Sequence, residues 1–135
     1  MKKYENYAKH MEVLARSSQQ DLENEFIVSG IIDKFFIQFE LGWKLLKELL
    51  KYEGKTVGAS GSPREVIKGA YACYDFLEED IWLSMLKSRN DLAHIYDEEQ
   101  AQRLLKTILE IYIPELGRLL AGIRKRYGDE MQSII

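Results

Sequence analysis

The longest apolar pattern in this sequence covers residues 22–52 and recurs at the spacing of an α-helix. Large apolar side chains fall three or four residues apart throughout, from Phe26 through Phe39 to Leu50. Additional apolar residues widen the stripe, and a wide stripe contacts more than one neighbouring helix. At 1.5 Å per residue such a helix is roughly 45 Å long, a length typical of helical bundles. We therefore expect a helix that is central in the fold or shared with a second chain.

The rest of the sequence predicts further helices separated by short polar breaks. Only 2 prolines interrupt the chain, and no run alternates apolar and polar residues as a strand does. We expect helices over residues 3–17, 22–52, 63–74, 81–95 and 97–126, N-capped by Asp21, Ser62, Asp80 and Asp97, with a kink at Pro114. Residues 54–62 are rich in glycine and predict a loop. The sequence thus predicts one all-α domain over residues 1–135, an up-and-down four-helix bundle with a short accessory helix.

Charge and composition limit the function classes. With 19 Lys and Arg against 22 Asp and Glu the net charge is −3, so any contact with RNA should be local. The single cysteine, Cys73, supports neither an internal disulfide nor a cysteine-rich zinc site, and no metal-ligand spacing occurs. The sequence has no membrane-length apolar run and no apolar signal-peptide stretch after Met1. We expect a cytoplasmic protein with no cofactor, no metal and no membrane contact.

Chemistry-bearing residues concentrate in residues 87–97, where one predicted helix ends and the next begins. Of the two histidines, His10 is expected on a solvated face, whereas His94 lies in this polar segment with Arg89. Arginine suits a phosphate, and neutral histidine can exchange a proton with a ribose 2′-OH, so the pair can cleave RNA without a metal. On an ideal helix the two side chains diverge by roughly 140°, so they meet at one ligand only if the helix distorts or two chains contribute. The alternative is a helix end whose cations only complement the helix dipole.

Three blocks of the sequence resemble a known family. Residues 89–96 (RNDLAHIY) are similar to the R-x4-H-x-Y motif of HEPN domains, the higher-eukaryote and prokaryote nucleotide-binding group. Residues 39–47 (FELGWKLLK), and 62–65 (SPRE) with Trp82-Leu83 behind them, resemble its branch of nucleotidyltransferase substrate-binding proteins. The resemblance extends over almost the whole chain and depends on the order and spacing of the blocks.

This resemblance implies a homodimeric helical bundle that works with a separate minimal nucleotidyltransferase. The chain would bind nucleotide or RNA phosphate near Arg89 and His94. Alternatively it would be an endoribonuclease toxin with these two residues as the catalytic pair, and the nucleotidyltransferase, as antitoxin, would adenylylate Tyr96. Asn90 and Asp91 would be supporting residues. A third alternative, from the residues alone, is a purely structural dimeric bundle.

The block at residues 39–47 also has an interpretation without the resemblance. Phe39 and Trp43 are expected in the core or in a dimer interface, because aromatic stripes at helical spacing usually are. Glu40 is expected to pair with Lys44 if it is exposed, or to orient Arg89 if it turns inward.

Overall fold

The computed structural model of this chain describes residues 1–95 and 97–134. All regular structure in those ranges is helical, which confirms the predicted all-α class. The helices are α1 (Lys2–Leu14), α2 (Glu25–Tyr52), α3 (Val57–Ser60), α4 (Pro63–Cys73), α5 (Glu79–Asn90), α6 (Glu98–Thr107) and α7 (Ile113–Tyr127). Short 3₁₀ turns cover Ser17–Gln19, Leu92–His94 and Gly128–Gln132, and a π-helical segment, Ile108–Tyr112, joins α6 to α7.

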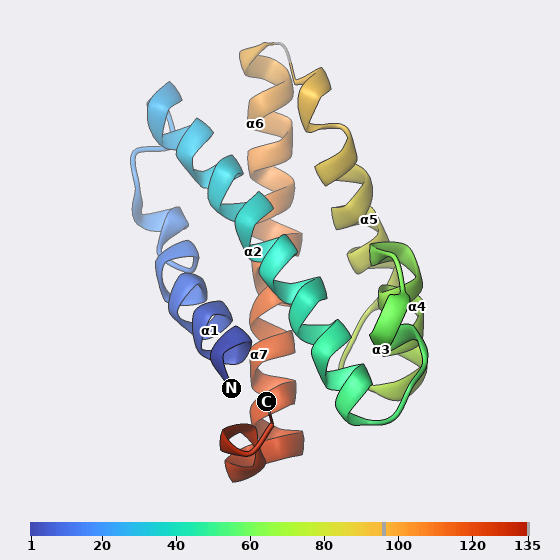
Figure 1. The fold of residues 1–135 in the computed structure, drawn as a ribbon. Coiled ribbons are helices and arrows are strands. Elements are labelled where there is room, and N and C mark those ends of the chain that lie inside the picture. Colours follow the sequence, from blue (N-terminus) through green and yellow to red (C-terminus); the bar gives the residue numbers. More distant parts are fainter. Residues whose placement is uncertain (96, 135) are drawn as a thin grey trace.

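Helix α2 lies at the centre of the arrangement and contacts α1, α4, α6 and α7 (Figure 1). Helices α6 and α7 form one long rod behind it, and α1 and α5 flank it on opposite sides. The apolar stripe of α2 is the core of the protein, with fully buried Phe35, Phe39, Leu45, Leu46, Leu49 and Leu50. The two chain ends lie together, since the Met1 ammonium donates to the Met131 carbonyl at 2.9 Å. The expectation that this helix is central is therefore confirmed within the chain.

The predicted start of this helix at residue 22 is wrong. Helix α2 begins at Glu25, because the Asn24 side chain accepts the backbone N–H of Phe26 at 2.9 Å and caps it. Asp21, the expected cap, instead accepts the Glu23 N–H at 3.2 Å within the preceding turn. Two nearby Asx residues compete for the same role, and the sequence pattern alone does not rank them.

Helix α1 is also shorter than predicted, ending at Leu14 and not at residue 17. The Ser17 hydroxyl is buried and donates to the Leu14 carbonyl at 2.6 Å, which turns the chain into a 3₁₀ turn. His10 does not lie on a fully solvated face as expected. Its ring is partly buried, and Nδ1 donates to Gln38 Oε1 at 2.6 Å, so its contact is a structural one between α1 and α2.

The glycine-rich residues 54–62 do not form the predicted loop throughout, because they contain the short helix α3. Gly54 ends α2 with a φ of 79°, and the Lys55 N–H returns to the Leu50 carbonyl at 2.9 Å, which is a Schellman ending. Helix α3 then lies directly on the α2 backbone. A Cβ at Gly58 would stand 2.3 Å from the Lys51 nitrogen, so only glycine fits there.

We expect Gly58→Ala to lower the free energy of unfolding by roughly 1–3 kcal/mol, because α3 must move away from α2 to admit the methyl group. Gly30→Ala is the matched control, since Gly30 is inside α2 and an added methyl group there would meet nothing within 4 Å. This control should raise stability by about 0.5–1 kcal/mol, the usual gain of alanine over glycine in a helix. Urea unfolding of both variants measures the difference. An equal effect of the two substitutions would contradict the close packing of α3.

The second half of the chain confirms two predicted helix starts and corrects one. Ser62 and Asp97 are N-caps as predicted, and each forms a capping box, with Glu65 and Gln100 respectively. Helix α5 covers Glu79–Asn90 and not residues 81–95, and it begins after Glu78 without Asp80 as its cap. The Glu78 N–H is instead satisfied by a carboxylate from α7, a contact between distant residues that local sequence does not reveal.

Pro114 does not bend one continuous α-helix at its own position. The irregularity precedes it as the π-helical segment Ile108–Tyr112, and Pro114 then falls in the first turn of α7. Helix α7 ends at Tyr127, one residue later than predicted, before Gly128 with a φ of 50°.

Candidate functional site

Arg89 lies in the last turn of α5 and is held by a carboxylate from the middle of α2. Its Nε donates to Glu40 Oε1 at 2.7 Å, and both side chains are largely covered, at 28% and 18% exposed. The other oxygen, Glu40 Oε2, accepts the indole N–H of Trp43 at 2.8 Å. Among the described residues Glu40 thus pairs with Arg89 and not with Lys44. This contact fixes the guanidinium through Nε and does not occupy its terminal nitrogens.

The helix that carries Arg89 ends one residue later, at Asn90. Asp91 leaves the helical conformation with φ −92° and ψ 0°, and a 3₁₀ turn follows over Leu92–His94. The His94 N–H donates to the Asp91 carbonyl at 2.9 Å, which tightens the turn. A 3₁₀ helix advances by about 120° per residue, so two side chains five residues apart still diverge, and the turn alone does not place Arg89 and His94 on one face. The α-helix nevertheless ends between the two residues.

The two supporting candidates have different neighbours. Asn90 Oδ1 accepts from Arg89 Nη1 at 3.2 Å, so it lies against the guanidinium. Asp91 pairs with Lys87 Nζ at 3.0 Å on an exposed part of the helix end. Tyr96, the expected modification site, lies outside the described residues. His94 is exposed at the end of its turn.

Sequence reasoning missed a partly buried polar cluster on α5, on the N-terminal side of Arg89. The Tyr112 hydroxyl lies 2.7 Å from Ser84 Oγ and 2.8 Å from Ser88 Oγ, and its ring stacks on Phe35 with the centroids 5.0 Å apart. Tyr112 is the last residue of the π-helical segment. The wider π turn rotates the positions that follow it, so the Tyr112 side chain faces α5. The sequence offered one indication of this cluster, because Ser84 and Ser88 are four residues apart and therefore lie on the same face of a helix. The cluster fixes the last two turns of α5, and with them the position of Arg89.

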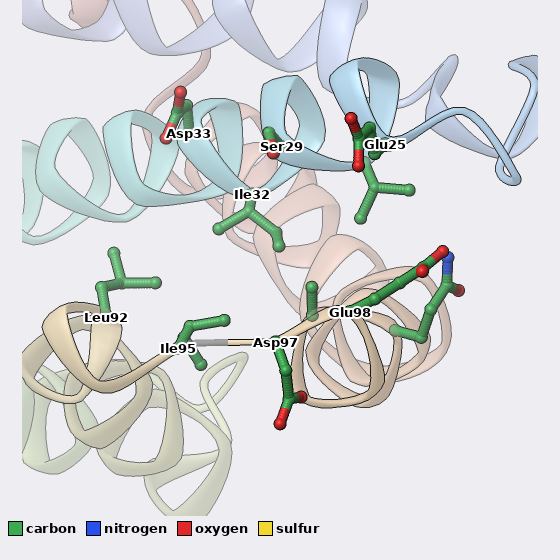
Figure 2. Close-up of a pocket in the computed structure, with 11 residues that line it drawn as sticks. Glu25, Ser29, Ile32, Asp33, Leu92, Ile95, Asp97 and Glu98 are labelled. Carbon is green, nitrogen blue, oxygen red and sulfur yellow. The ribbon is translucent and has the colours of Figure 1, made fainter.

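A hollow of about 350 Å³ lies beside the 3₁₀ turn, between α2 and the start of α6 (Figure 2). Ile32 points from α2 toward Leu92 and Ile95, and these side chains form an apolar floor. Its rim is acidic, with Glu25, Asp33, Asp97 and Glu98. A phosphate is repelled by such a rim, so an anionic ligand of Arg89 should extend away from this hollow.

The described residues contain no group of three or more His, Cys, Asp or Glu side chains placed to hold a metal ion. None of the helices described combines the length and the apolar character needed to span a membrane.

Comparison with known proteins adds two findings. Residues 1–125 match the family model described as nucleotidyltransferase substrate binding protein like. The chain is also similar to a Haemophilus influenzae protein named probable ribonuclease HepT, with 26% identity over 111 residues, which cover 80% of this chain and 75% of that protein. Both matches include the segment that carries Arg89.

Proposed function

We propose that this chain, which belongs to the nucleotidyltransferase substrate binding protein-like family of HEPN proteins, is an endoribonuclease that works with a separate minimal nucleotidyltransferase. The observation that carries the proposal is the anchored guanidinium of Arg89 at the end of α5, directly before the turn that presents His94. The printed name of the similar Haemophilus protein supports ribonuclease activity, and the family description supports the nucleotidyltransferase partner.

In the proposed reaction, neutral His94 accepts the proton of a ribose 2′-OH. The 2′-oxygen attacks the adjacent phosphorus, and the bond to the 5′-oxygen of the next nucleotide breaks. Arg89 stabilises the negative charge that develops on the phosphoryl oxygens, because its guanidinium is planar and permanently charged. The proton on His94 is returned to the departing 5′-oxygen, so the products are a 2′,3′-cyclic phosphate and a 5′-hydroxyl.

The remaining parts of the proposal concern assembly and control. We regard the arrangement of α1, α2, α5 and the α6–α7 rod as an up-and-down four-helix bundle that forms a homodimer in the cytoplasm. The nucleotidyltransferase would act as antitoxin by adenylylating Tyr96, two residues after His94, which would block the site.

Expression of the wild-type chain alone is expected to arrest growth and degrade cellular RNA, and His94→Ala is expected to relieve both effects. RNA integrity on a denaturing gel and the 2′,3′-cyclic phosphate ends of the fragments are the measurements. His10→Ala is the matched control, because His10 contacts Gln38 between α1 and α2 and should leave cleavage intact.

Intact RNA and normal growth with the wild-type chain would contradict the proposed ribonuclease activity. They would then favour a second function, substrate binding, which the family description supports. In that function the same residues bind nucleotide or RNA phosphate for the nucleotidyltransferase without turnover.

A further inference from the structure

Helix α2 carries one stripe of charged residues whose sign changes at Glu40. At 100° per residue, positions 25, 33, 40, 44, 47 and 51 fall within an arc of about 100°. The first three are Glu25, Asp33 and Glu40, and the last three are Lys44, Lys47 and Lys51. The candidate site lies at the change of sign, because Glu40 is the residue that holds Arg89.

The basic half of this stripe borders a hollow of about 400 Å³. Among the described residues its lining includes Lys3, Lys44, Lys47 and Lys51 and one carboxylate, Glu48, which pairs with Lys3 at 3.2 Å. In the described part of the chain Lys44, Lys47 and Lys51 form no ion pair. Gly58 and Ala59 of α3 also line it. Three uncompensated ammonium groups around one hollow are a local concentration of positive charge in a chain of net charge −3.

An aromatic side chain lies inside this basic hollow. Trp43 lines it and is only partly buried. The ammonium groups of Lys44 and Lys47 lie 5.9 and 6.0 Å from the ring centroid. An aromatic ring among cations is the arrangement with which proteins bind single-stranded nucleic acid, because bases stack on the ring and phosphates contact the cations.

Trp43 also connects this hollow physically to the candidate site. Its indole N–H and the Arg89 Nε donate to the two oxygens of the same carboxylate, Glu40, at 2.8 and 2.7 Å. A strand bound at Arg89 therefore reaches the Trp43 ring without crossing any other charged group of the α2 stripe. In the opposite direction it would meet the acidic hollow lined by Glu25 and Asp33.

We propose that the hollow lined by Trp43, Lys44, Lys47 and Lys51 binds a stretch of single-stranded RNA that continues from the Arg89 site, with a base stacked on Trp43 and phosphates on the three lysines. This inference depends on the proposed function only in taking RNA as the ligand of Arg89. It assigns a direction to the substrate, along α2 toward its C-terminal end and away from the acidic hollow. Single-stranded RNA is favoured over an acidic peptide because peptide carboxylates can contact the lysines but cannot stack on the Trp43 ring as a base can.

Binding is measured by fluorescence anisotropy of a labelled single-stranded 2′-O-methyl oligoribonucleotide, which lacks the attacking hydroxyl and stays intact. The combined variant Lys44→Gln, Lys47→Gln and Lys51→Gln should bind at least about tenfold more weakly at low salt. Its slope of log Kd against log salt should decrease by about 2, at roughly 0.7 per lost phosphate contact. The matched control, Lys9→Gln, Lys34→Gln and Lys106→Gln, removes the same charge from exposed positions elsewhere and should retain wild-type binding.

The stacking part is tested with Trp43→Leu and with an abasic strand of equal length. Trp43→Leu should weaken binding of the base-carrying strand roughly tenfold, and binding of the abasic strand hardly at all. Trp43→Phe keeps a ring but loses the N–H to Glu40, and it should retain most of the affinity. Thermal melting of each variant establishes that it is folded.

Several results would overturn the proposal: equal losses in the two triple-lysine variants, equal affinity for the abasic strand, equal affinity for duplex RNA, or equal competition by a polyglutamate peptide. Because binding is measured without cleavage, failure of the proposed ribonuclease activity can be distinguished from failure of the proposed RNA-binding hollow. A wild-type chain that binds the strand through these residues but leaves RNA intact contradicts only the ribonuclease. A wild-type chain that cleaves RNA, with KM unchanged in the lysine variant, contradicts only the RNA hollow.

Discussion

Replacing Glu115 by alanine is expected to lower the free energy of unfolding by about 3–5 kcal/mol. The Glu115 side chain is completely buried, and its Oε2 accepts the Glu78 N–H at 2.9 Å and the Trp82 indole N–H at 3.0 Å. Its Oε1 lies 3.4 Å from Arg118 Nη1. Alanine leaves the buried Trp82 indole N–H and the partly buried Glu78 N–H without their acceptor and opens a cavity beside Trp82, and both effects destabilise the fold.

Glu115→Gln is the matched control, because its amide oxygen can still accept both N–H groups. It should stay within about 1 kcal/mol of the wild type at neutral pH, since it also removes a buried charge. Urea unfolding of the three proteins measures both changes. A loss below about 1 kcal/mol for Glu115→Ala would mean that the two donors find other acceptors.

The same carboxyl group predicts a pH dependence of stability. Burial raises the pKa of Glu115, and the Glu78 N–H, Arg118 and Trp82 offset only part of this rise. The folded protein therefore takes up a proton on Glu115 at a higher pH than the unfolded chain does. The contribution of Glu115 to the free energy of unfolding therefore increases as the pH falls through its raised pKa in the folded protein. The increase is complete below the pKa of glutamate in the unfolded chain, about 4.3. The stability difference between wild type and Glu115→Gln should shift in favour of the wild type over that range.

The features that were predicted well from the sequence depend on neighbouring residues. The N-caps at Ser62 and Asp97 each require only three or four consecutive positions. The wide apolar stripe of α2 is likewise visible in the spacing of neighbouring residues, and that spacing indicates which face of the helix is buried. Where two local signals competed, as Asp21 and Asn24 did, neither could be preferred without the surrounding fold.

The features that sequence reasoning missed depend on residues far apart in the chain. The π-helical segment brings Tyr112 to Ser84 and Ser88, and Pro114 marks only its neighbourhood. Glu115 looks like an ordinary acidic residue in a first helical turn, and nothing local shows that it is buried against Trp82.

At the candidate site, the residue types around Arg89 were predictable from the sequence. Whether Glu40 would pair with Lys44 or with Arg89 was not predictable, because the pairing depends on how α5 packs against α2.

If the proposed ribonuclease is correct, Arg89→Ala should lower the rate of RNA cleavage by at least about 10³-fold, because Arg89 stabilises charge in the transition state. Glu40→Ala should lower it by about 10²-fold, because Arg89 loses the carboxylate that fixes its Nε. Glu40 does not touch the reacting phosphate in this scheme, so it is a positioning residue. Initial rates on a defined RNA strand give both values.

A double-mutant cycle separates positioning by Glu40 from an independent role. If Glu40 acts only through Arg89, the Arg89→Ala, Glu40→Ala protein should cleave as slowly as Arg89→Ala alone, and no slower. Glu40→Asp should restore part of the rate, since it keeps the charge on a shorter arm. Lys87→Ala is the control on the same helix end, because it breaks the exposed pair with Asp91 and leaves the Arg89 contact intact. Additive losses in the double variant would show that Glu40 serves the reaction by another route, such as holding Trp43 through its second oxygen.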